Sequence, residues 1–504
     1  FMPSPTRALL AVVVCVLLSA ADLSAAKKPD PLVRITPVAP TEQIPVSDFF
    51  RPGLLADPQL NAAGTHVVAL VNMGGDRDGL AIIQLADMKV QTLRGSRGLD
   101  VYEYSWLNDD RILFSVIRDK LFSEGLFVAD IKNLKRNYVL EPYSAVYVLG
   151  RPDGAKTKPL IWVRQNAYDD GKDAGVFQID AMRNTGGEQT AVSGAMGTKD
   201  SGAGAAHGVS AHVLRSFPKP PSGHPVVYFA DVHGDMGYLV TIGSGEKLAL
   251  FALDQGRWNL CPVDLEGVDL ESVGEKPGEL LVGTRPGPGR PRALYRLEAR
   301  TGTLGDALIH DDEYDVTNVT VHREHDTHRI LGVSYTARTE KTVWFDPKRQ
   351  QVQAMVQQQF PGQTVTLLDA DKAGDRFVVR TRSDRHPTAY HTLHLSQRSM
   401  GLLKNPRPWI DPARMRPQSI VSYKARDGAS IEAYLTLPEG ASESNRAPLI
   451  VMPHGGPWAR DTWGWSPDVQ FLVSRGYAVL QPNYRGSTGY DWKFREEDLA
   501  DFRK

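Results

Sequence analysis

Short apolar runs recur along residues 50–404, each preceded by a turn and then by a polar residue or proline. Runs of four or five mostly apolar residues between Gly, Asp, Asn and Pro clusters have the length and flanks of buried β-strands. The runs read VVALV, ILFSV, LIWV, VVYF, LLVG, ILGV and FVVR, and follow His66, Arg111, Pro159, Pro225, Glu279, Arg329 and Arg376. This pattern predicts a β structure for the region.

The spacing of the runs is regular, at 45, 48, 66, 54, 50 and 47 residues. The longest interval contains a Gly- and Ala-rich stretch, residues 194–208, which we expect to be a flexible insertion. Many runs are followed by a second strand ending in an acidic or polar turn, and a repeat of roughly 40–50 residues with about four strands is typical of a β-propeller blade. We therefore predict a seven-bladed β-propeller over residues 50–404. The alternative, a pair of large β-sandwiches, would not keep such spacing.

The pattern changes after residue 404. Residues 405–418 contain four prolines and predict a linker. Residues 419–438 predict a hairpin turning at Asp427-Gly428. An apolar strand (447–456), a helix that starts on Ser466-Pro467 and ends on Gly476, and a second apolar strand (477–486) follow. Strand, helix and strand predict the first part of an α/β domain with parallel strands, over residues 419–504.

Gly455 and Gly456 follow the end of the first of these strands, where open α/β sheets bind ligands. Because glycine has no Cβ, backbone N–H groups there can approach a substrate oxygen closely. Such donors stabilise the oxyanion of acyl transfer, and HGG-type loops supply one of them in α/β-hydrolases. A plain Gly-Gly-Pro turn is the alternative.

The combination of PHGGPWARD, a helix and PNYRGSTGY resembles the prolyl oligopeptidase family of serine peptidases, in its acylaminoacyl-peptidase and dipeptidyl-peptidase-like branch. The resemblance is carried by residues 419–490 and is architectural over the propeller. It implies an N-terminal seven-bladed propeller followed by an α/β-hydrolase (peptidase) domain. It also implies that the Gly456 N–H forms half of the oxyanion hole.

The resemblance assigns supporting roles to neighbouring residues. His454, with Gly455, shapes the loop and is not the catalytic base, and Arg485 and Gly486 support the floor of the site. Trp458 is a candidate substrate contact, although packing of the loop by Trp458, Trp463 and Trp465 explains these residues equally well.

The sequence contains no Gly-x-Ser-x-Gly, the turn that carries an α/β-hydrolase nucleophile. Ser487 lies in RGSTG and lacks the glycine two residues before it. We therefore expect a fragment without the nucleophile Ser, Asp and His, inactive alone and poorly packed after the linker, with the strand at residues 477–484 as an exposed edge.

The N-terminal residues and the composition indicate where the protein is located. Arg7 followed by an apolar run at residues 8–21 predicts a signal peptide, residues 1–26, and periplasmic or secreted export; a membrane anchor is the alternative, for which the run is short. Residues 27–49 form an N-terminal segment. With 58 basic and 59 acidic residues, the chain shows no bias toward nucleic acid or a membrane surface. After cleavage Cys261 remains as a single cysteine, without an internal disulfide.

We expect no metal and no organic cofactor. His322, His325 and His328 are three residues apart, but they precede an apolar run, and a solvated loop accounts for them better than a metal site. The predicted function is an exported serine-type peptidase that cleaves short peptides through an acyl-enzyme. A non-catalytic propeller that binds a ligand, with a relic hydrolase segment, is the alternative, and an esterase would use the same loop.

Overall fold

The structure is a computed structural model that describes residues 42–490 except 75–76, 96–97, 121, 143, 166–172, 184–211 and 457–458. The predicted signal peptide (1–26) and the Gly/Ala-rich stretch (194–208) lie outside the described residues. Within the described part of the chain, no helix has both the length and the apolar character needed to cross a membrane.

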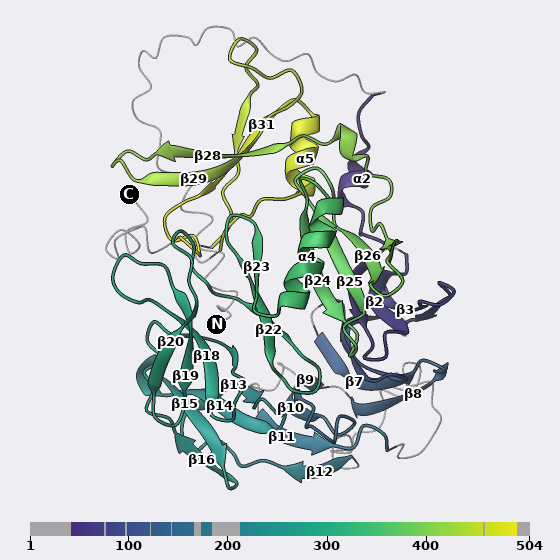
Figure 1. Cartoon of the computed structure of the whole chain (residues 1–504), viewed down its shortest axis with the longest axis vertical. Coiled ribbons are helices and arrows are strands. Elements are labelled where there is room, and N and C mark those ends of the chain that lie inside the picture. The colour runs from purple at the N-terminus through teal and green to yellow at the C-terminus, as the bar shows by residue number, and fades with distance from the viewer. Residues whose placement is uncertain are drawn as a thin grey trace.

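Seven antiparallel sheets follow one another along the described residues 55–404, and we number them sheet 1 to sheet 7 in chain order (Figure 1). Six have four strands and sheet 6 has three. In each sheet, strands adjacent in the chain are paired.

Sheet 1 contains β1 (Leu55–Leu60), β2 (His66–Asn72), β3 (Asp78–Gln84) and β4 (Val90–Leu93), and sheet 2 contains β5 (Leu99–Asn108), β6 (Arg111–Arg118), β7 (Phe122–Asp130) and β8 (Asn133–Pro142). Sheet 3 contains β9 (Ser144–Gly150), β10 (Leu160–Gln165), β11 (Asp173–Ile179) and β12 (Val213–Ser216), and sheet 4 contains β13 (His224–Ala230), β14 (Met236–Ile242), β15 (Leu248–Asp254) and β16 (Arg257–Leu260). Between β14 and β15 lies the short helix η2 (Ser244–Glu246).

Sheet 5 contains β17 (Asp269–Val273), β18 (Glu279–Thr284), β19 (Ala293–Glu298) and β20 (Thr303–Ile309). Sheet 6 contains β21 (Thr320–Arg323), β22 (Ile330–Thr336) and β23 (Glu340–Trp344). Sheet 7 contains β24 (Thr364–Ala370), β25 (Arg376–Arg382), β26 (Ala389–His394) and β27 (Ser399–Lys404). Helix α4 (Pro347–Gln359) connects sheets 6 and 7, and the Asp346 side chain caps it by accepting the N–H of Arg349.

Burial falls from the second strand to the fourth strand in these sheets. Strands β14 and β22 each begin with six consecutive buried residues, whereas β16 and β20 are mostly exposed. A strand that is buried without alternation is covered on both of its faces. Six of the seven apolar runs lie on second strands, because those strands need apolar side chains on both faces.

The run after Pro225 is different. It lies on β13, the first strand of sheet 4, where Val226 and Val227 are 43% and 39% exposed. The second strand of that sheet is β14, with the sequence MGYLVTI. An apolar run alone does not reveal which strand has both faces covered.

Each sheet shares a hydrophobic cluster with the next one, and sheet 7 shares one with sheet 1. In the closing cluster, Leu55 and Val67 of sheet 1 pack with Val378 and Leu403 of sheet 7. The Leu60 N–H also donates to the Asp369 carboxylate over 2.9 Å. The seven sheets are therefore in cyclic contact, and side chains from neighbouring sheets fill the spaces between them.

An eighth, mixed sheet follows the ring. It contains β28 (Gln418–Lys424), β29 (Ser430–Thr436), β30 (Leu449–Val451) and β31 (Ala478–Asn483), in the order β28-β29-β31-β30. The predicted hairpin is confirmed, and β30 and β31 are parallel, as expected for strands connected through helix α5 (Pro467–Ser474). Ser466 caps α5 by accepting the Val469 N–H.

The prediction that residues 477–484 form an exposed edge is wrong. Strand β31 lies between β29 and β30, so its backbone is paired on both sides. The edge strand is β30, in which Leu449 and Val451 are each 55% exposed. The connection through α5 places β31 in the interior of the sheet and β30 at its edge, which sequence order alone does not indicate.

The segment before the ring packs against the C-terminal sheet. Helix α2 (Val46–Phe50) brings Phe49 into contact with Phe471 of α5, with ring centroids 5.8 Å apart. Residues 405–417, with the short helix η3 (Pro412–Arg414), contribute Ile410 and Met415 to the same cluster. The Trp409 indole N–H donates to the Asp48 carbonyl over 2.8 Å. The predicted linker therefore packs as part of the C-terminal unit.

Core packing in sheet 7 gives the first prediction. Phe377 is 1% exposed and packs with α4, so Phe377→Ala should lower the free energy of unfolding by about 3–5 kcal/mol. Phe345 is 39% exposed, and Phe345→Ala should change it by less than about 1 kcal/mol. Denaturant unfolding followed by fluorescence checks both values, and equal effects would contradict this account of the core.

Candidate functional site

The loop after β30 is held by aromatic stacking and hydrogen bonds. The His454 ring stacks on the Tyr484 ring at 4.4 Å with an interplanar angle of 17°, and the Tyr484 hydroxyl donates to the His454 carbonyl over 2.8 Å. Gly455 and Gly456 follow and are exposed. Gly456 has a φ of 133°, a conformation that disfavours any side chain. Trp458 lies outside the described residues.

His454 and Ser487 form a pair that resembles a catalytic dyad. His454 Nε2 lies 2.8 Å from Ser487 Oγ, and Nδ1 lies 2.8 Å from the Gly455 carbonyl oxygen. Because a carbonyl can only accept, Nδ1 carries the proton and Nε2 accepts the Ser487 hydroxyl. Ser487 is 0% exposed, so a substrate carbonyl has no access to it. The pair instead fixes the loop that carries Gly456.

Arg485 and Gly486 lie in the turn after β31. The Arg485 guanidinium makes two hydrogen bonds to the Asp427 carboxylate, of 2.5 and 2.8 Å, which connect this turn to the β28–β29 turn. The bonds from Arg485 lower the pKa of Asp427. Gly486 has a φ of 86°, and the Ser487 N–H closes the turn on the Tyr484 carbonyl. These contacts position the backbone beneath His454.

A buried polar junction connects this region to sheet 6, and sequence reasoning missed it. Arg460 donates to the Ala337 carbonyl and to the Tyr490 hydroxyl, each over 2.8 Å. The Tyr490 hydroxyl donates to Glu432 over 2.6 Å, and the Arg460 guanidinium lies 4.5 Å from the Tyr490 ring centroid. Burial, together with the Glu432 carboxylate, raises the pKa of Tyr490. Arg460 and Tyr490 lie in the two motifs that carry the family resemblance, PHGGPWARD and PNYRGSTGY, which was the available signal.

Trp463 and Trp465 line a cavity of about 430 Å³ between the loop before α5 and sheet 7. The Trp463 indole N–H donates to the Gln418 carbonyl over 3.2 Å, and Trp465 packs with the cluster that contains Phe49. Arg460 and Asp461 line the same cavity. Among the described residues, these tryptophans therefore pack the loop while bordering a cavity.

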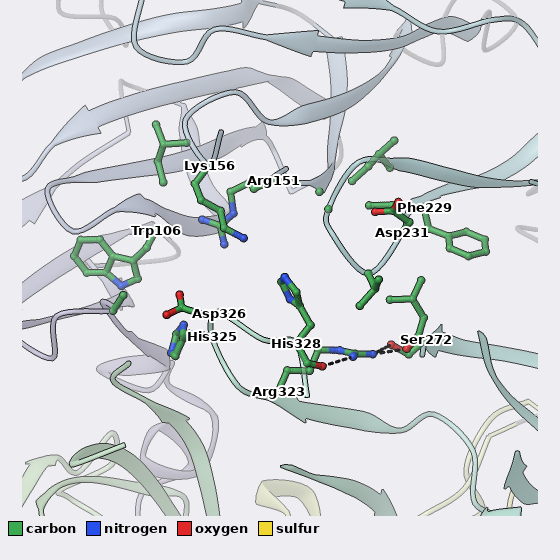
Figure 2. A pocket seen from close by; sticks show the side chains of 18 of the residues that line it. Trp106, Arg151, Lys156, Phe229, Asp231, Ser272, Arg323, His325, Asp326 and His328 are labelled. Atoms are coloured by element: carbon green, nitrogen blue, oxygen red, sulfur yellow. Dashed lines mark hydrogen bonds between the residues drawn. The ribbon is translucent and has the colours of Figure 1, made fainter. Parts of the chain in front are cut away.

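A larger cavity of about 1000 Å³ lies at the centre of the ring, and all seven sheets contribute to its lining (Figure 2). Its charged side chains include Arg151, Lys156, Asp231, Arg323 and Asp326. They come mainly from the turns between first and second strands. The C-terminal sheet contacts the opposite ends of these strands, as the Arg460 bond to Ala337 after β22 illustrates.

The three histidines at positions 322, 325 and 328 do not converge on one another. His322 lies on β21 rather than in a turn, and its Nε2 is 2.7 Å from Ser334 Oγ. His325 Nε2 lies 2.8 Å from the Ala370 carbonyl oxygen, and His328 Nε2 lies 2.7 Å from Asp153 Oδ2. The predicted solvated loop is therefore correct only for the exposed part of the turn around His325.

Comparisons with known proteins show relatives of one kind. No family model matches the chain. Dipeptidyl aminopeptidase BIII of Pseudoxanthomonas mexicana is 36% identical over 124 residues, which are 23% of this chain and 18% of the relative. An acylamino-acid-releasing enzyme of Sus scrofa is 43% identical over 63 residues, which are 12% of this chain and 9% of the relative. The matched segments are thus less than a fifth of either relative.

A solved structure of an acylaminoacyl peptidase in complex with Z-Gly-Gly-Phe-chloromethyl ketone has a TM-score of 0.57 at 15% identity, covering 89% of this chain and 68% of its own. At this identity the likeness shows the fold. The curated relatives are named as a dipeptidyl aminopeptidase and an acylamino-acid-releasing enzyme, which are the kinds of enzyme in the branch that the motifs resemble. These names confirm the predicted resemblance, and the structural neighbours add a likeness of fold.

Burial of Ser487 predicts that the 504-residue chain is not modified at this residue by a fluorophosphonate. A hydroxyl without solvent access cannot reach the phosphorus atom, although a histidine accepts its proton. Peptide mapping by mass spectrometry after treatment of the folded chain checks this. An adduct on Ser487 in the folded chain would show that the His454 pair is a reactive dyad.

His322 predicts an acid-dependent loss of stability. Burial lowers the pKa of His322 from the ordinary value of 6.5 to about 4. The folded state therefore favours the neutral ring, and its stabilisation is complete above pH 6.5 and is lost as the pH falls toward 4. We expect His322→Gln to reduce this loss by on the order of 2–3 kcal/mol. Unfolding free energies at pH 7 and pH 4.5 check it, and identical pH dependence in both proteins would contradict it.

Proposed function

We propose that this chain forms the substrate-admitting and oxyanion-binding part of an exported serine-type peptidase that cleaves short peptides through an acyl-enzyme. The observation that carries the proposal is the loop after β30. Two exposed glycines follow a strand that runs parallel to its neighbour, and His454 holds them through Tyr484 and Ser487. Export rests on the signal peptide predicted over residues 1–26.

The proposed chemistry is acyl transfer. A base takes the proton of a serine hydroxyl as its oxygen attacks the peptide carbonyl carbon. The carbonyl oxygen becomes an oxyanion, and the Gly456 N–H donates a hydrogen bond to it. The C–N bond then breaks, the base passes the proton to the leaving amine, and water hydrolyses the acyl-enzyme ester, which regenerates the serine. Because residues 1–504 contain no Gly-x-Ser-x-Gly turn, the proposed nucleophile, acid and base lie outside these residues. The 504-residue chain alone is then inactive.

The cyclic contact of sheets 1 to 7 supports a seven-bladed β-propeller over residues 50–404. Side chains from every sheet surround the central cavity, and a folded protein is much larger than about 1000 Å³. In the proposal the propeller therefore admits short peptides and excludes folded proteins.

The mixed sheet supports a partial α/β-hydrolase domain over residues 419–504. Strand β30 has an exposed apolar edge, with Leu449 and Val451 each 55% exposed. Natural sheets cover or pair such edges. A further strand beside β30 would lie next to the Gly456 loop, which is the position that a nucleophile requires.

The central cavity suggests a second candidate function. The cationic side chains of Arg151, Lys156 and Arg323 and the carboxylates of Asp231 and Asp326 all line it. This mixed lining would suit a ligand that carries both charges, bound by a non-catalytic propeller with a relic hydrolase segment.

Extension of the reading frame gives the test of the proposed function. We expect the source DNA to continue beyond the Lys504 codon into a Gly-x-Ser-x-Gly motif, and the longest frame to react with a fluorophosphonate at that serine. The 504-residue chain should remain unlabelled. A stop codon after Lys504 and no labelling of either form would favour the binding propeller.

Substitution in the extended protein tests the oxyanion donor. Gly456→Ala should lower kcat/KM for a short peptide by roughly 10²-fold, because a side chain disfavours the φ of 133° and displaces the donor. Gly476→Ala is the control, since Gly476 has a φ of 91° and an added Cβ there meets no atom within 4 Å. Equal activity of the two variants would remove Gly456 from the mechanism.

A further inference from the structure

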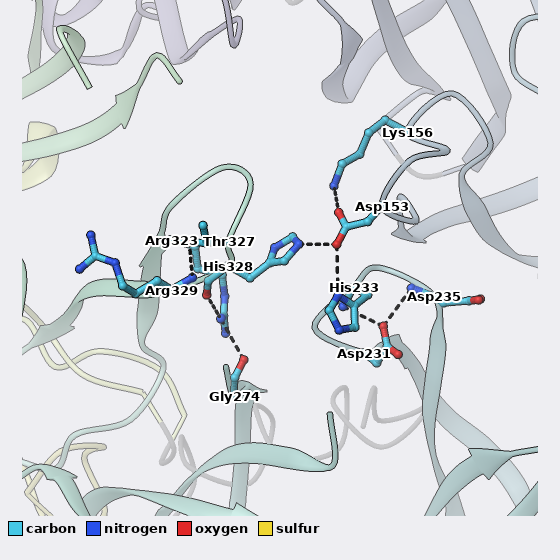
Figure 3. Close-up of polar contacts among 10 residues, drawn as sticks. All are labelled: Asp153, Lys156, Asp231, His233, Asp235, Gly274, Arg323, Thr327, His328 and Arg329. Carbon is cyan, nitrogen blue, oxygen red and sulfur yellow. Dashed lines mark hydrogen bonds and ion pairs between the residues drawn. The ribbon is translucent and has the colours of Figure 1, made fainter. Parts of the chain in front are cut away.

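Three side chains from separate sheets converge at the rim of the central cavity (Figure 3). Asp153 lies between β9 and β10, His233 between β13 and β14, and His328 between β21 and β22. Asp153 Oδ2 is 2.7 Å from His328 Nε2 and 3.2 Å from His233 Nδ1. The donor atoms of all three side chains lie within 4.8 Å of one another.

This cluster forms because the sheets close into a ring, and its residues are not part of one local sequence motif. Asp153 and His328 are 175 positions apart, in sheets 3 and 6, which share no hydrophobic cluster among the described residues. His328 therefore reaches across the cavity to meet the turns of sheets 3 and 4. Its side chain is only 15% exposed, so its imidazole is held near the carboxylate rather than free in solvent.

The hydrogen bonds of Asp153 suit a metal ligand. Lys156 Nζ binds one carboxylate oxygen, Oδ1, over 2.6 Å. Oδ1 is thus occupied by the lysine, and Oδ2 is directed toward both imidazoles. A ligating carboxylate is commonly hydrogen-bonded through its second oxygen in this way.

We propose that Asp153, His233 and His328 form a binding site for a divalent transition metal of the zinc type. Two imidazole nitrogens and one carboxylate oxygen are a donor set that Zn²⁺ accepts, with water as a fourth ligand. Tetrahedral coordination at about 2.0–2.1 Å places donors roughly 3.3 Å apart. The Asp153–His328 contact opens slightly and the two imidazoles approach each other, which rotation of the exposed His233 side chain permits.

A bound metal would connect sheet 6 to sheets 3 and 4 by coordination bonds at one end of the cavity. The far end, near the C-terminal sheet, would be unaffected. The site uses only the arrangement of the ring, so it is independent of the proposed peptidase activity. Its role would be to fix the width of the opening that Lys156 and His328 border.

Zinc titration of the full 504-residue chain, purified without a histidine tag and stripped with a chelator, tests the site. Isothermal titration calorimetry should show one Zn²⁺ per chain. His328→Ala and His233→Ala should each weaken binding at least about tenfold. His325→Ala is the matched control, because it removes an imidazole from the same turn whose Nε2 lies 2.8 Å from the Ala370 carbonyl oxygen, and it should bind like the parent chain.

Two further measurements keep the result decisive. Asp153→Asn preserves the shape of the side chain, and together with circular dichroism of each variant it separates loss of a ligand from loss of fold. The visible spectrum of the Co²⁺ complex should lack a thiolate charge-transfer band, which distinguishes the site from binding at a cysteine. The proposal is overturned if the chain shows no saturable Zn²⁺ binding, or if the three histidine variants bind it equally; the cluster is then a hydrogen-bonded contact alone.

Discussion

Closure of the ring rests on a partly buried carboxylate beside the hydrophobic cluster that sheets 1 and 7 share. Asp369 of sheet 7 accepts the N–H groups of Leu60 and Ala370, and burial raises its pKa. The bond to Leu60 joins positions 309 residues apart. Around it, Arg376 donates to the Gly64 carbonyl and Lys372 N–H donates to the Ala62 carbonyl. Because first and last sheets meet here, the turns of all seven face one cavity.

Cyclic closure explains both what the sequence revealed and what it concealed. Second strands need apolar side chains on both faces, so their runs were visible, whereas the run on β13 misled because its valines are exposed. Helix α4 was not predicted, although Asp346-Pro347, a capping residue followed by proline, is a signal for the start of a helix. The loop residues His454 to Gly456 were found from motif spacing, but their contacts with Tyr484 and Ser487 required the fold.

Contacts between distant positions left no comparable signal. The residues near Asp153 in the sequence do not indicate that His328 will approach it. The strand order that places β31 in the interior of the mixed sheet and β30 at its edge follows from packing on α5 rather than from local propensity. Arg460 and Tyr490 lay within recognised motifs, yet their bond depends on how the mixed sheet packs against sheet 6. Sequence patterns report local environment; partners across the ring depend on its closure.

The packing of α2 on α5 has a consequence for synthesis. Phe49 and Phe50 leave the ribosome early, but their partner Phe471 follows more than four hundred residues later. At about 5–20 residues per second this is a delay of roughly 20–80 s. During that time the seven sheets can form while the two aromatic rings await Phe471 and the Ile44 carbonyl awaits Arg475. Nascent chains of this protein therefore expose the apolar rings of Phe49 and Phe50, and a chaperone that covers these rings would act before the last strands are translated.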